Sequence, residues 1–157
     1  MPPTWRNFLQ RNGAPHSRQT HTVAIVDAGP LVAATDRNDV HHARSVAVLQ
    51  RPDLRLVIPT MVVAKATYFV NLRGGPTAEA TFLRGMHRFE VEGPQPDDWL
   101  RIADLVEQYA DFPLGGTDAS IIALAERLQA DVVVTLDGRH FAAVRPRHVP
   151  YLRVLPE

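Results

Sequence analysis

Short apolar runs alternate with stretches of helical periodicity along most of the chain. Five of the short runs have the length and composition of β-strands: 23–27, 55–58, 88–92, 131–136 and 151–155. Six stretches space apolar residues as helices do: those after Pro30, Asp39 and Pro59, then 76–86, 96–109 and 117–129. Because strands that alternate with helices build parallel sheets, the pattern predicts an α/β fold with a central parallel sheet flanked by helices.

The stretch 59–86 is predicted to contain two helices rather than one. Gly74, Gly75 and Pro76 interrupt its helical pattern, and these residue types end or kink helices. The first helix carries an apolar face formed by Val62, Val63, Ala66, Phe69 and Val70. We therefore expect a helical hairpin whose apolar surface exceeds what the hairpin can bury against itself, so that a partner can bind there.

The length of the chain bounds its domain organisation. A chain of 157 residues is sufficient for one compact domain, which we assign to residues 23–157. Residues 1–22 contain Arg6, Arg11 and Arg18 but no acidic residue, and they lack the apolar run of a secretory signal. Prolines and a glycine also disfavour a long helix there. We expect this segment to be a basic, disordered tail outside the fold.

Composition excludes several classes of function. Hydrophobic residues make up 45% of the chain and charged residues 22%, which is typical of a globular protein. The 17 basic and 17 acidic residues leave no net charge, so no global basic field attracts nucleic acid. Without cysteine the chain has no disulfide, no thiolate metal site and no cysteine nucleophile. No apolar run is long enough to span a membrane, and we expect a soluble, cytoplasmic protein.

Three aspartates stand where strands or a neighbouring helix meet one edge of the predicted sheet. Asp27 follows "VAIV", Asp137 follows "VVVTL", and Asp118 lies in "GGTDAS". Each alone has a structural explanation, since aspartates cap helices and begin turns. Three carboxylates at one edge would repel one another, however, unless a cation neutralised them. Hard oxygen ligands suit Mg²⁺ or Mn²⁺, so we predict that Asp27, Asp118 and Asp137 hold such an ion.

These motifs resemble those of the PIN-domain ribonucleases, in particular the VapC-type toxins of toxin–antitoxin pairs. The resemblance covers residues 23–157 and is carried by "IVDAGPLVAATD" with "DRNDVHH", by "DFPLGGTDASIIALAERL", and by "VVVTLDGRHFAAVRP". It implies a PIN-like fold, Mg²⁺- or Mn²⁺-dependent hydrolysis of RNA phosphodiesters, and a cognate antitoxin that blocks the site. Together with the apolar hairpin, the resemblance leads us to expect a homodimer.

One position departs from the family pattern. The resemblance places a glutamate in the helix after the second strand, where this chain has Lys65 in "PTMVVAKATYFV". No acidic residue lies between Asp53 and Glu79 to replace it. Lys65 is the only lysine beside 16 arginines, which makes it an unusual choice for a merely solvated helix residue. We expect the substitution to weaken metal binding and nuclease activity while leaving the fold intact.

Other polar residues near the motifs have two explanations, and the sequence leaves both open. Thr117 and Thr135 precede site acids, and they either orient a carboxylate or a water or are ordinary helix-start and strand residues. Arg139, Arg145 and Arg147 either contact RNA phosphates or are solvated charges.

Two other functions are compatible with parts of the pattern. A non-catalytic PIN-like module would bind an antitoxin, and RNA, without cleavage, and Lys65 favours it. A phosphoryl-aspartate enzyme also uses an aspartate after the first strand, but the dehalogenase pattern needs an acid where this chain has Gly29. The response-receiver pattern needs a lysine after a late strand, whereas Lys65 lies in an early helix. We rank a metal-dependent endoribonuclease first.

Overall fold

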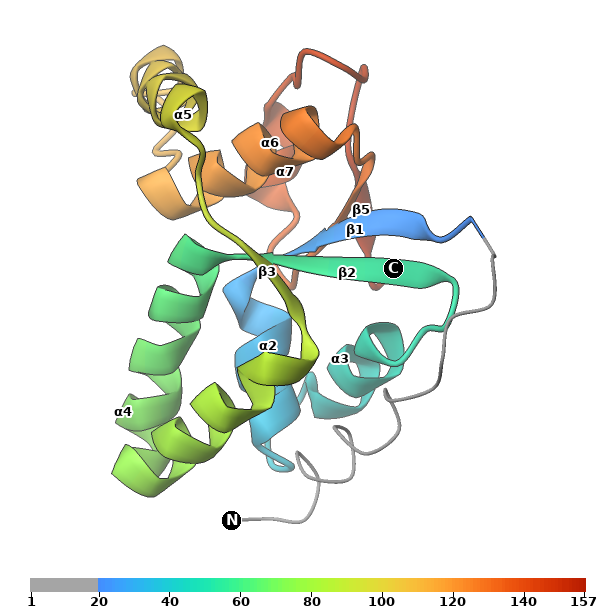
Figure 1. Cartoon of the computed structure of the whole chain (residues 1–157), viewed down its shortest axis with the longest axis vertical. Coiled ribbons are helices and arrows are strands. Elements are labelled where there is room, and N and C mark those ends of the chain that lie inside the picture. The colour runs from blue at the N-terminus through green and yellow to red at the C-terminus, as the bar shows by residue number, and fades with distance from the viewer. Residues whose placement is uncertain (1–19) are drawn as a thin grey trace.

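One five-stranded sheet forms the centre of the fold in the computed structural model, which describes residues 20–157 (Figure 1). Its strands are parallel to their neighbours and have the order β3-β2-β1-β4-β5. They are β1 (Thr22–Val26), β2 (Leu54–Pro59), β3 (Glu90–Glu92), β4 (Val132–Val134) and β5 (Arg153–Leu155). The five strands predicted from the sequence are confirmed, with ends shifted by one or two residues.

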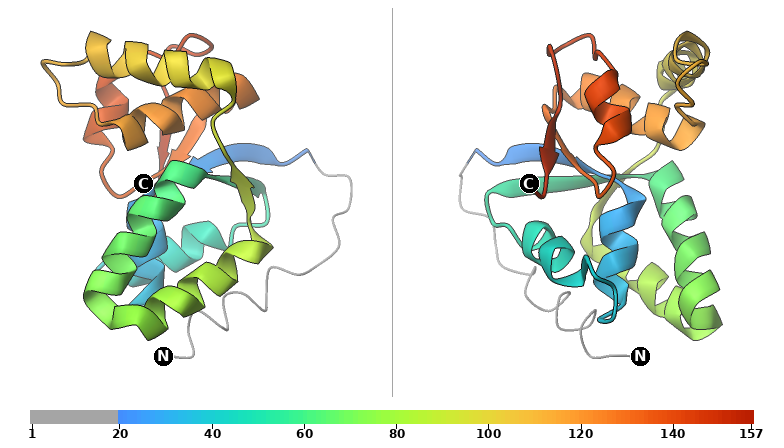
Figure 2. Two further views of the ribbon diagram at one scale, coloured as in Figure 1. Left: turned by 60° about the vertical axis from the view of Figure 1, so that its left-hand side comes forward. Right: turned by 180° about the vertical axis from the view of Figure 1, so that it is seen from behind.

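Helices connect the strands and cover both faces of the sheet. They are α2 (Ala28–Thr35), α3 (His42–Leu49), α4 (Thr60–Gly85), the 3₁₀ helix η1 (Met86–Arg88), α5 (Pro96–Gln108), α6 (Gly116–Leu128) and α7 (Arg139–Ala143). Figures 1 and 2 show α2, α3 and α4 on one side of the sheet and α5, α6 and α7 on the other. None of the helices within residues 20–157 combines the length and the apolarity that a membrane span requires.

The central strands are buried on both faces. Residues 24–26 of β1 and 132–134 of β4 are at most 1% exposed. Continuous apolar runs of this kind are typical of parallel strands covered by helices on both sides. Since β1 and β4 are neighbours in the sheet, the residues that come after them emerge side by side at one edge of the core.

The predicted break in the 59–86 stretch is confirmed. α4 continues from Thr60 to Gly85, but Gly75 has φ 69° and ψ −172°, which are not helical values. Glycine adopts a positive φ without the steric penalty that a Cβ atom brings, and Pro76 then begins the second arm. α4 therefore consists of two helical arms joined by a kink at Gly75.

The apolar face predicted for the first arm of α4 is only partly buried. Ala66 and Val70 lie in the core, whereas Phe69 is 38% exposed. Tyr68 and Leu72 are more exposed still, at 64% and 68%. The first arm therefore presents a second apolar face, formed by Tyr68, Phe69 and Leu72, to solvent.

The structure differs from the predicted elements at three places. α2 begins at Ala28, before Pro30, because Asp27 caps it and proline is tolerated in a first helical turn. The helix α7 is absent from the prediction, since five residues are too few for a periodic pattern. The predicted tail, residues 1–22, lies outside the described residues except for its last three, and Thr22 already belongs to β1.

Candidate functional site

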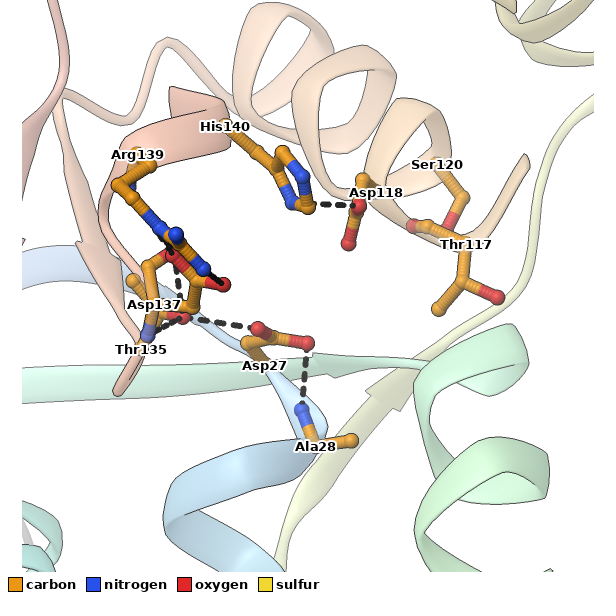
Figure 3. Close-up of polar contacts among 9 residues, drawn as sticks. All are labelled: Asp27, Ala28, Thr117, Asp118, Ser120, Thr135, Asp137, Arg139 and His140. Atoms are coloured by element: carbon orange, nitrogen blue, oxygen red, sulfur yellow. Dashed lines mark hydrogen bonds and ion pairs between the residues drawn. The ribbon is translucent and has the colours of Figure 1, made fainter. Parts of the chain in front are cut away.

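The three predicted site acids lie at one edge of the sheet, where β1 and β4 end. Asp27 directly follows β1, Asp137 comes shortly after β4, and Asp118 lies in the first turn of α6. β1 and β4 are parallel neighbours, so their carboxyl ends meet at the same edge. Figure 3 shows the three acids around one region, which Arg139 and His140 of α7 border.

Asp27 is fixed by two hydrogen bonds. Its Oδ1 accepts a bond of 2.6 Å from the backbone N–H of Ala28, so it is the N-cap of α2. Its Oδ2 accepts a bond of 2.8 Å from the hydroxyl of Thr135, and the residue is only 8% exposed. A carboxylate accepts about four hydrogen bonds, so capping leaves lone pairs of Asp27 for a further ligand.

Asp118 has the least favourable electrostatic environment of the three acids. The residue is 8% exposed, and burial raises the pKa of its carboxyl above the usual value. Repulsion from Asp27, and less from Asp137, raises that pKa further, whereas Lys65 and His140 lower it. Because the net pKa shift is upward, the surroundings of Asp118 supply too little positive charge to compensate for burial.

His140 contacts Asp118 and is absent from the site predicted from the sequence. Its Nδ1 lies 3.2 Å from Oδ2 of Asp118, and its ring meets the ring of Phe112 edge to face, with 5.4 Å between centroids. In the sequence His140 follows Asp137 in "DGRH", and α7 turns it back toward the acids. A histidine about one helical turn beyond a site acid is the signal that would have identified it.

Asp137 is paired with an arginine of its own loop. Nε and Nη2 of Arg139 donate to the two carboxylate oxygens of Asp137 at 2.9 and 3.0 Å. These bonds, assisted by the backbone N–H of Arg139, lower the pKa of Asp137 to about 2. Arg139, which the sequence leaves as an RNA contact or a solvated charge, is therefore the ion-pair partner of a site acid.

The donor set suits a divalent cation, although the side chains are not gathered around a single point. Within residues 20–157 no three histidine, aspartate or glutamate side chains lie close enough to hold an ion together. Asp27 and Asp118 are nearly buried carboxylates that repel each other, and a divalent ion relieves such repulsion. Asp137 fits as a third ligand when it leaves Arg139. The metal site of Asp27, Asp118 and Asp137 stays a prediction.

Lys65 lies on the first arm of α4, near the acids. It is partly buried, and its charge lowers the pKa of Asp118. In the described part of the chain it forms no ion pair with any acid, so it acts on Asp118 through space. The site thus has a positive charge nearby where the family resemblance places a glutamate.

The two threonines of the site make different contacts. The hydroxyl of Thr135 donates to Asp27 and accepts the backbone N–H of Asp137 at 3.1 Å, so it links two of the acids. Thr135 is also 2% exposed, which keeps water from competing for these bonds. Thr117 contributes its backbone carbonyl, which accepts the hydroxyl of Ser120 at 2.6 Å. Thr135 is therefore the threonine that orients a site carboxylate.

Arg145 and Arg147 follow α7 and have partners of their own. Nη1 of Arg145 donates to the carbonyl of Ala142 at 2.9 Å, and the backbone N–H of Arg147 donates to Glu126 at 3.0 Å. Both arginines are exposed. A contact between these arginines and RNA phosphates stays a prediction.

Comparison with solved structures identifies the fold. The structure of VapC20 from Mycobacterium tuberculosis, described as a toxin that cleaves the sarcin-ricin loop, matches with a TM-score of 0.70 and 17% identity, over 81% of this chain and 98% of that one. VapBC2 from Rickettsia felis, bound to a promoter DNA fragment, matches with a TM-score of 0.61 and 15% identity, over 85% and 97%. A toxin–antitoxin complex from Klebsiella pneumoniae matches with a TM-score of 0.60 and 18% identity, over 83% and 99%. The predicted PIN-like fold is confirmed.

Sequence comparison identifies the family. Ribonuclease VapC26 from Mycobacterium tuberculosis is 32% identical over 124 residues, which make up 78% of this chain and 92% of the relative. The PIN domain family matches residues 24–145, a segment that contains Asp27, Asp118 and Asp137. The chain therefore belongs to the PIN domain family.

Proposed function

We propose that the protein is the toxin of a toxin–antitoxin pair, an endoribonuclease that hydrolyses RNA phosphodiesters. Its membership of the PIN domain family and its likeness to a protein named Ribonuclease VapC26 support this function. The observation that carries the proposal is the electrostatic coupling of two nearly buried acids, Asp27 and Asp118, at the edge of the sheet. Carboxylates in this situation favour a divalent cation between them.

In this function Asp27, Asp118 and Asp137 hold Mg²⁺ or Mn²⁺. When bound, the ion supplies charge that makes a water a better nucleophile and stabilises the negative charge that develops on the phosphate. The hydrogen bonds from Thr135 and Ala28 orient Asp27 before the ion arrives. Asp118 gains most from the ion, because its carboxylate is buried and repelled by Asp27. The helix α6 adds the positive end of its dipole beside Asp118.

Lys65 impairs this activity in our proposal. An ammonium repels a divalent ion, whereas the glutamate that the family resemblance places here would attract it. At about 4 Å and an effective dielectric of about 20, one pair of unit charges is worth on the order of 4 kcal/mol before screening. The influence of Lys65 on the pKa of Asp118 supports a position from which it opposes the ion.

A second candidate function is a non-catalytic PIN-like module that binds its antitoxin, and RNA, without cleavage. The observation that favours it is again Lys65, whose positive charge already replaces part of the charge that an ion would bring to Asp118. The two candidates share the fold and the partners. They differ in metal affinity and in cleavage of RNA.

We assign the exposed face of the first arm of α4 to a segment of the cognate antitoxin. Tyr68, Phe69 and Leu72 offer contiguous apolar side chains at helical spacing, which suits an apolar peptide segment. Two of the similar structures are a VapBC protein and a toxin–antitoxin complex, which supports this partner. We also propose that the protein is a homodimer.

The test of the proposed function compares the chain with its Lys65→Glu variant. We expect the variant to bind Mn²⁺ in isothermal titration calorimetry at least about tenfold more tightly, since each 1.4 kcal/mol is a factor of about ten. It should also cleave RNA in Mn²⁺ faster than the unchanged chain, and EDTA should abolish that cleavage. Asp27→Asn in the same background should abolish both binding and cleavage.

Two matched controls separate the charge of Lys65 from its shape. Lys65→Gln removes the positive charge without adding an acid and should give an intermediate affinity for Mn²⁺, and Lys65→Arg should leave the affinity unchanged. If the Lys65→Glu variant neither binds Mn²⁺ nor cleaves RNA, the endoribonuclease proposal is wrong and the non-catalytic module replaces it.

A further inference from the structure

Each of the three site acids has a different kind of partner. Asp27 accepts two neutral hydrogen bonds, from Thr135 and from the backbone of Ala28. Asp118 and Asp137 instead face side chains of consecutive residues, His140 and Arg139. Both of these residues stand at the start of α7, a helix of five residues. One short element therefore brings its own cationic side chain to the cluster (Figure 3).

The Arg139 guanidinium occupies the atoms of Asp137 that a metal ion needs. Its Nε donates to Oδ1 and its Nη2 to Oδ2, at 2.9 and 3.0 Å, so both carboxylate oxygens are engaged at once. A bidentate guanidinium and a metal ion compete for the same lone pairs, and they also repel each other as like charges. Asp137 cannot serve both cations fully.

The pair is exposed enough to exchange. The side chain of Arg139 is 85% exposed and that of Asp137 is 44% exposed. Exposed ion pairs are weak in water, because solvent and salt screen them. The guanidinium can leave by rotation of its own side chain into solvent, without repacking of α7, whose anchor in the core is Phe141.

We propose that Arg139 is an intramolecular counter-ion that competes with the divalent cation for Asp137. Metal binding and release of the Arg139 guanidinium are then one coupled exchange, in which the ion pair of Arg139 with Asp137 must open before the ion gains its third ligand. This inference rests on the proposed function, because it takes Asp137 as a metal ligand. It also accounts for an acidic cluster in which no three acids gather within residues 20–157.

The test measures Mn²⁺ affinity by calorimetry for the full chain and its Arg139→Gln variant, each with Lys65 and with Lys65→Glu. Removing the competitor should tighten Mn²⁺ binding roughly two- to fivefold, which is the range that an exposed ion pair is worth. Arg153→Gln is the matched control, because Arg153 forms a similarly exposed pair with Asp131 at 3.2 Å near the opposite ends of the strands. Arg145→Gln removes the same charge from the segment after α7 and controls for long-range electrostatics. Both controls should bind Mn²⁺ as the parent chain does.

The outcomes separate this inference from the proposed function. If Arg139→Gln binds Mn²⁺ no more tightly than the parent, while Asp27→Asn abolishes binding, the counter-ion role is wrong and the metal site stands. An equal gain in Arg145→Gln would also overturn the inference, because the effect would then be general charge. Absence of Mn²⁺ binding in every variant, including those with Lys65→Glu, would overturn both proposals together.

Discussion

The hydroxyl of Thr135 donates a hydrogen bond of 2.8 Å to Oδ2 of Asp27, across 108 positions of sequence. It joins the ends of β1 and β4, the two central strands of the sheet. The backbone N–H of Thr135 is itself held by the carbonyl of Leu155 at 2.8 Å. The orientation of the Asp27 carboxylate therefore depends on the packing of three strands rather than on its own loop.

Thr135→Val tests this relationship, because valine keeps the shape of threonine and lacks its hydroxyl. The variant leaves Oδ2 of Asp27 buried without its donor, so we expect a loss of about 1–3 kcal/mol in the free energy of unfolding. Unfolding in urea, followed by circular dichroism, measures the loss. Thr135→Ser retains the hydroxyl and should lose less. Equal losses in both variants would show that packing, and not the hydrogen bond, accounts for the effect.

Asp118 is predicted to cost stability at neutral pH. Burial first, and then repulsion from Asp27, raise the pKa of its carboxyl, so the folded state binds a proton more readily than the unfolded chain does. Asp118→Asn should therefore raise the free energy of unfolding at pH 7, by about 0.5–2 kcal/mol as for other stabilising changes at functional sites. The gain should shrink as the pH falls below the raised pKa of the folded protein and vanish below the ordinary value of 3.8.

Asp137 should show the opposite dependence on pH and serves as the comparison. Arg139 lowers its pKa to about 2, so its contribution to stability is present above the ordinary pKa of 3.8 and is lost as the pH falls toward 2. Asp137→Asn should thus destabilise the protein slightly at pH 7 and have no effect near pH 2. Stability curves of the same sign for the two asparagine variants would contradict this assignment.

The elements around the site can be predicted from sequence, whereas its side-chain contacts cannot. The apolar runs that end at Asp27 and before Asp137 are long enough to identify buried strands, and neighbouring parallel strands bring the residues after them to one edge of the sheet. The pairing of Arg139 with Asp137 depends on a rotamer in a loop, and α7 is too short for a periodic signal. His140 is missed for the same reason. Asp27 is both cap and site acid, so the two explanations that the sequence offers are not exclusive.

The protein is expected to form a dimer with twice its mass of 17.5 kDa. Apart from the first arm of α4, large apolar side chains are exposed on α5, where Trp99 is 52% and Leu100 is 68% exposed. Because we assign the α4 face to an antitoxin, we expect the dimer to bury the α5 face. Light scattering after size exclusion should give a dimer that Trp99→Glu with Leu100→Glu converts to a monomer.

The matched control for the dimer is the pair of changes Tyr68→Glu and Leu72→Glu on α4. These residues are similarly exposed, and the control should stay dimeric. A monomer at every concentration would contradict the dimer, and a dimer broken only by the α4 changes would reverse the assignment of the two faces.

Thermal unfolding tests the metal site without any substrate. A ligand at about 100 times its dissociation constant stabilises the folded state by about 2.7 kcal/mol, which for a chain of 157 residues corresponds to a rise in Tm of about 5–10 °C. We expect Mn²⁺ to produce such a rise in the Lys65→Glu variant. At the same Mn²⁺ concentration the chain with Lys65 should show a rise smaller by at least about 3 °C, since a tenfold weaker affinity removes about 1.4 kcal/mol. EDTA should return both proteins to their starting values, and Asp118→Asn should remove the response to Mn²⁺ while keeping its own higher Tm. Equal rises with Lys65 and with Lys65→Glu would mean that the ammonium does not oppose the ion, and the proposed impairment would then be wrong.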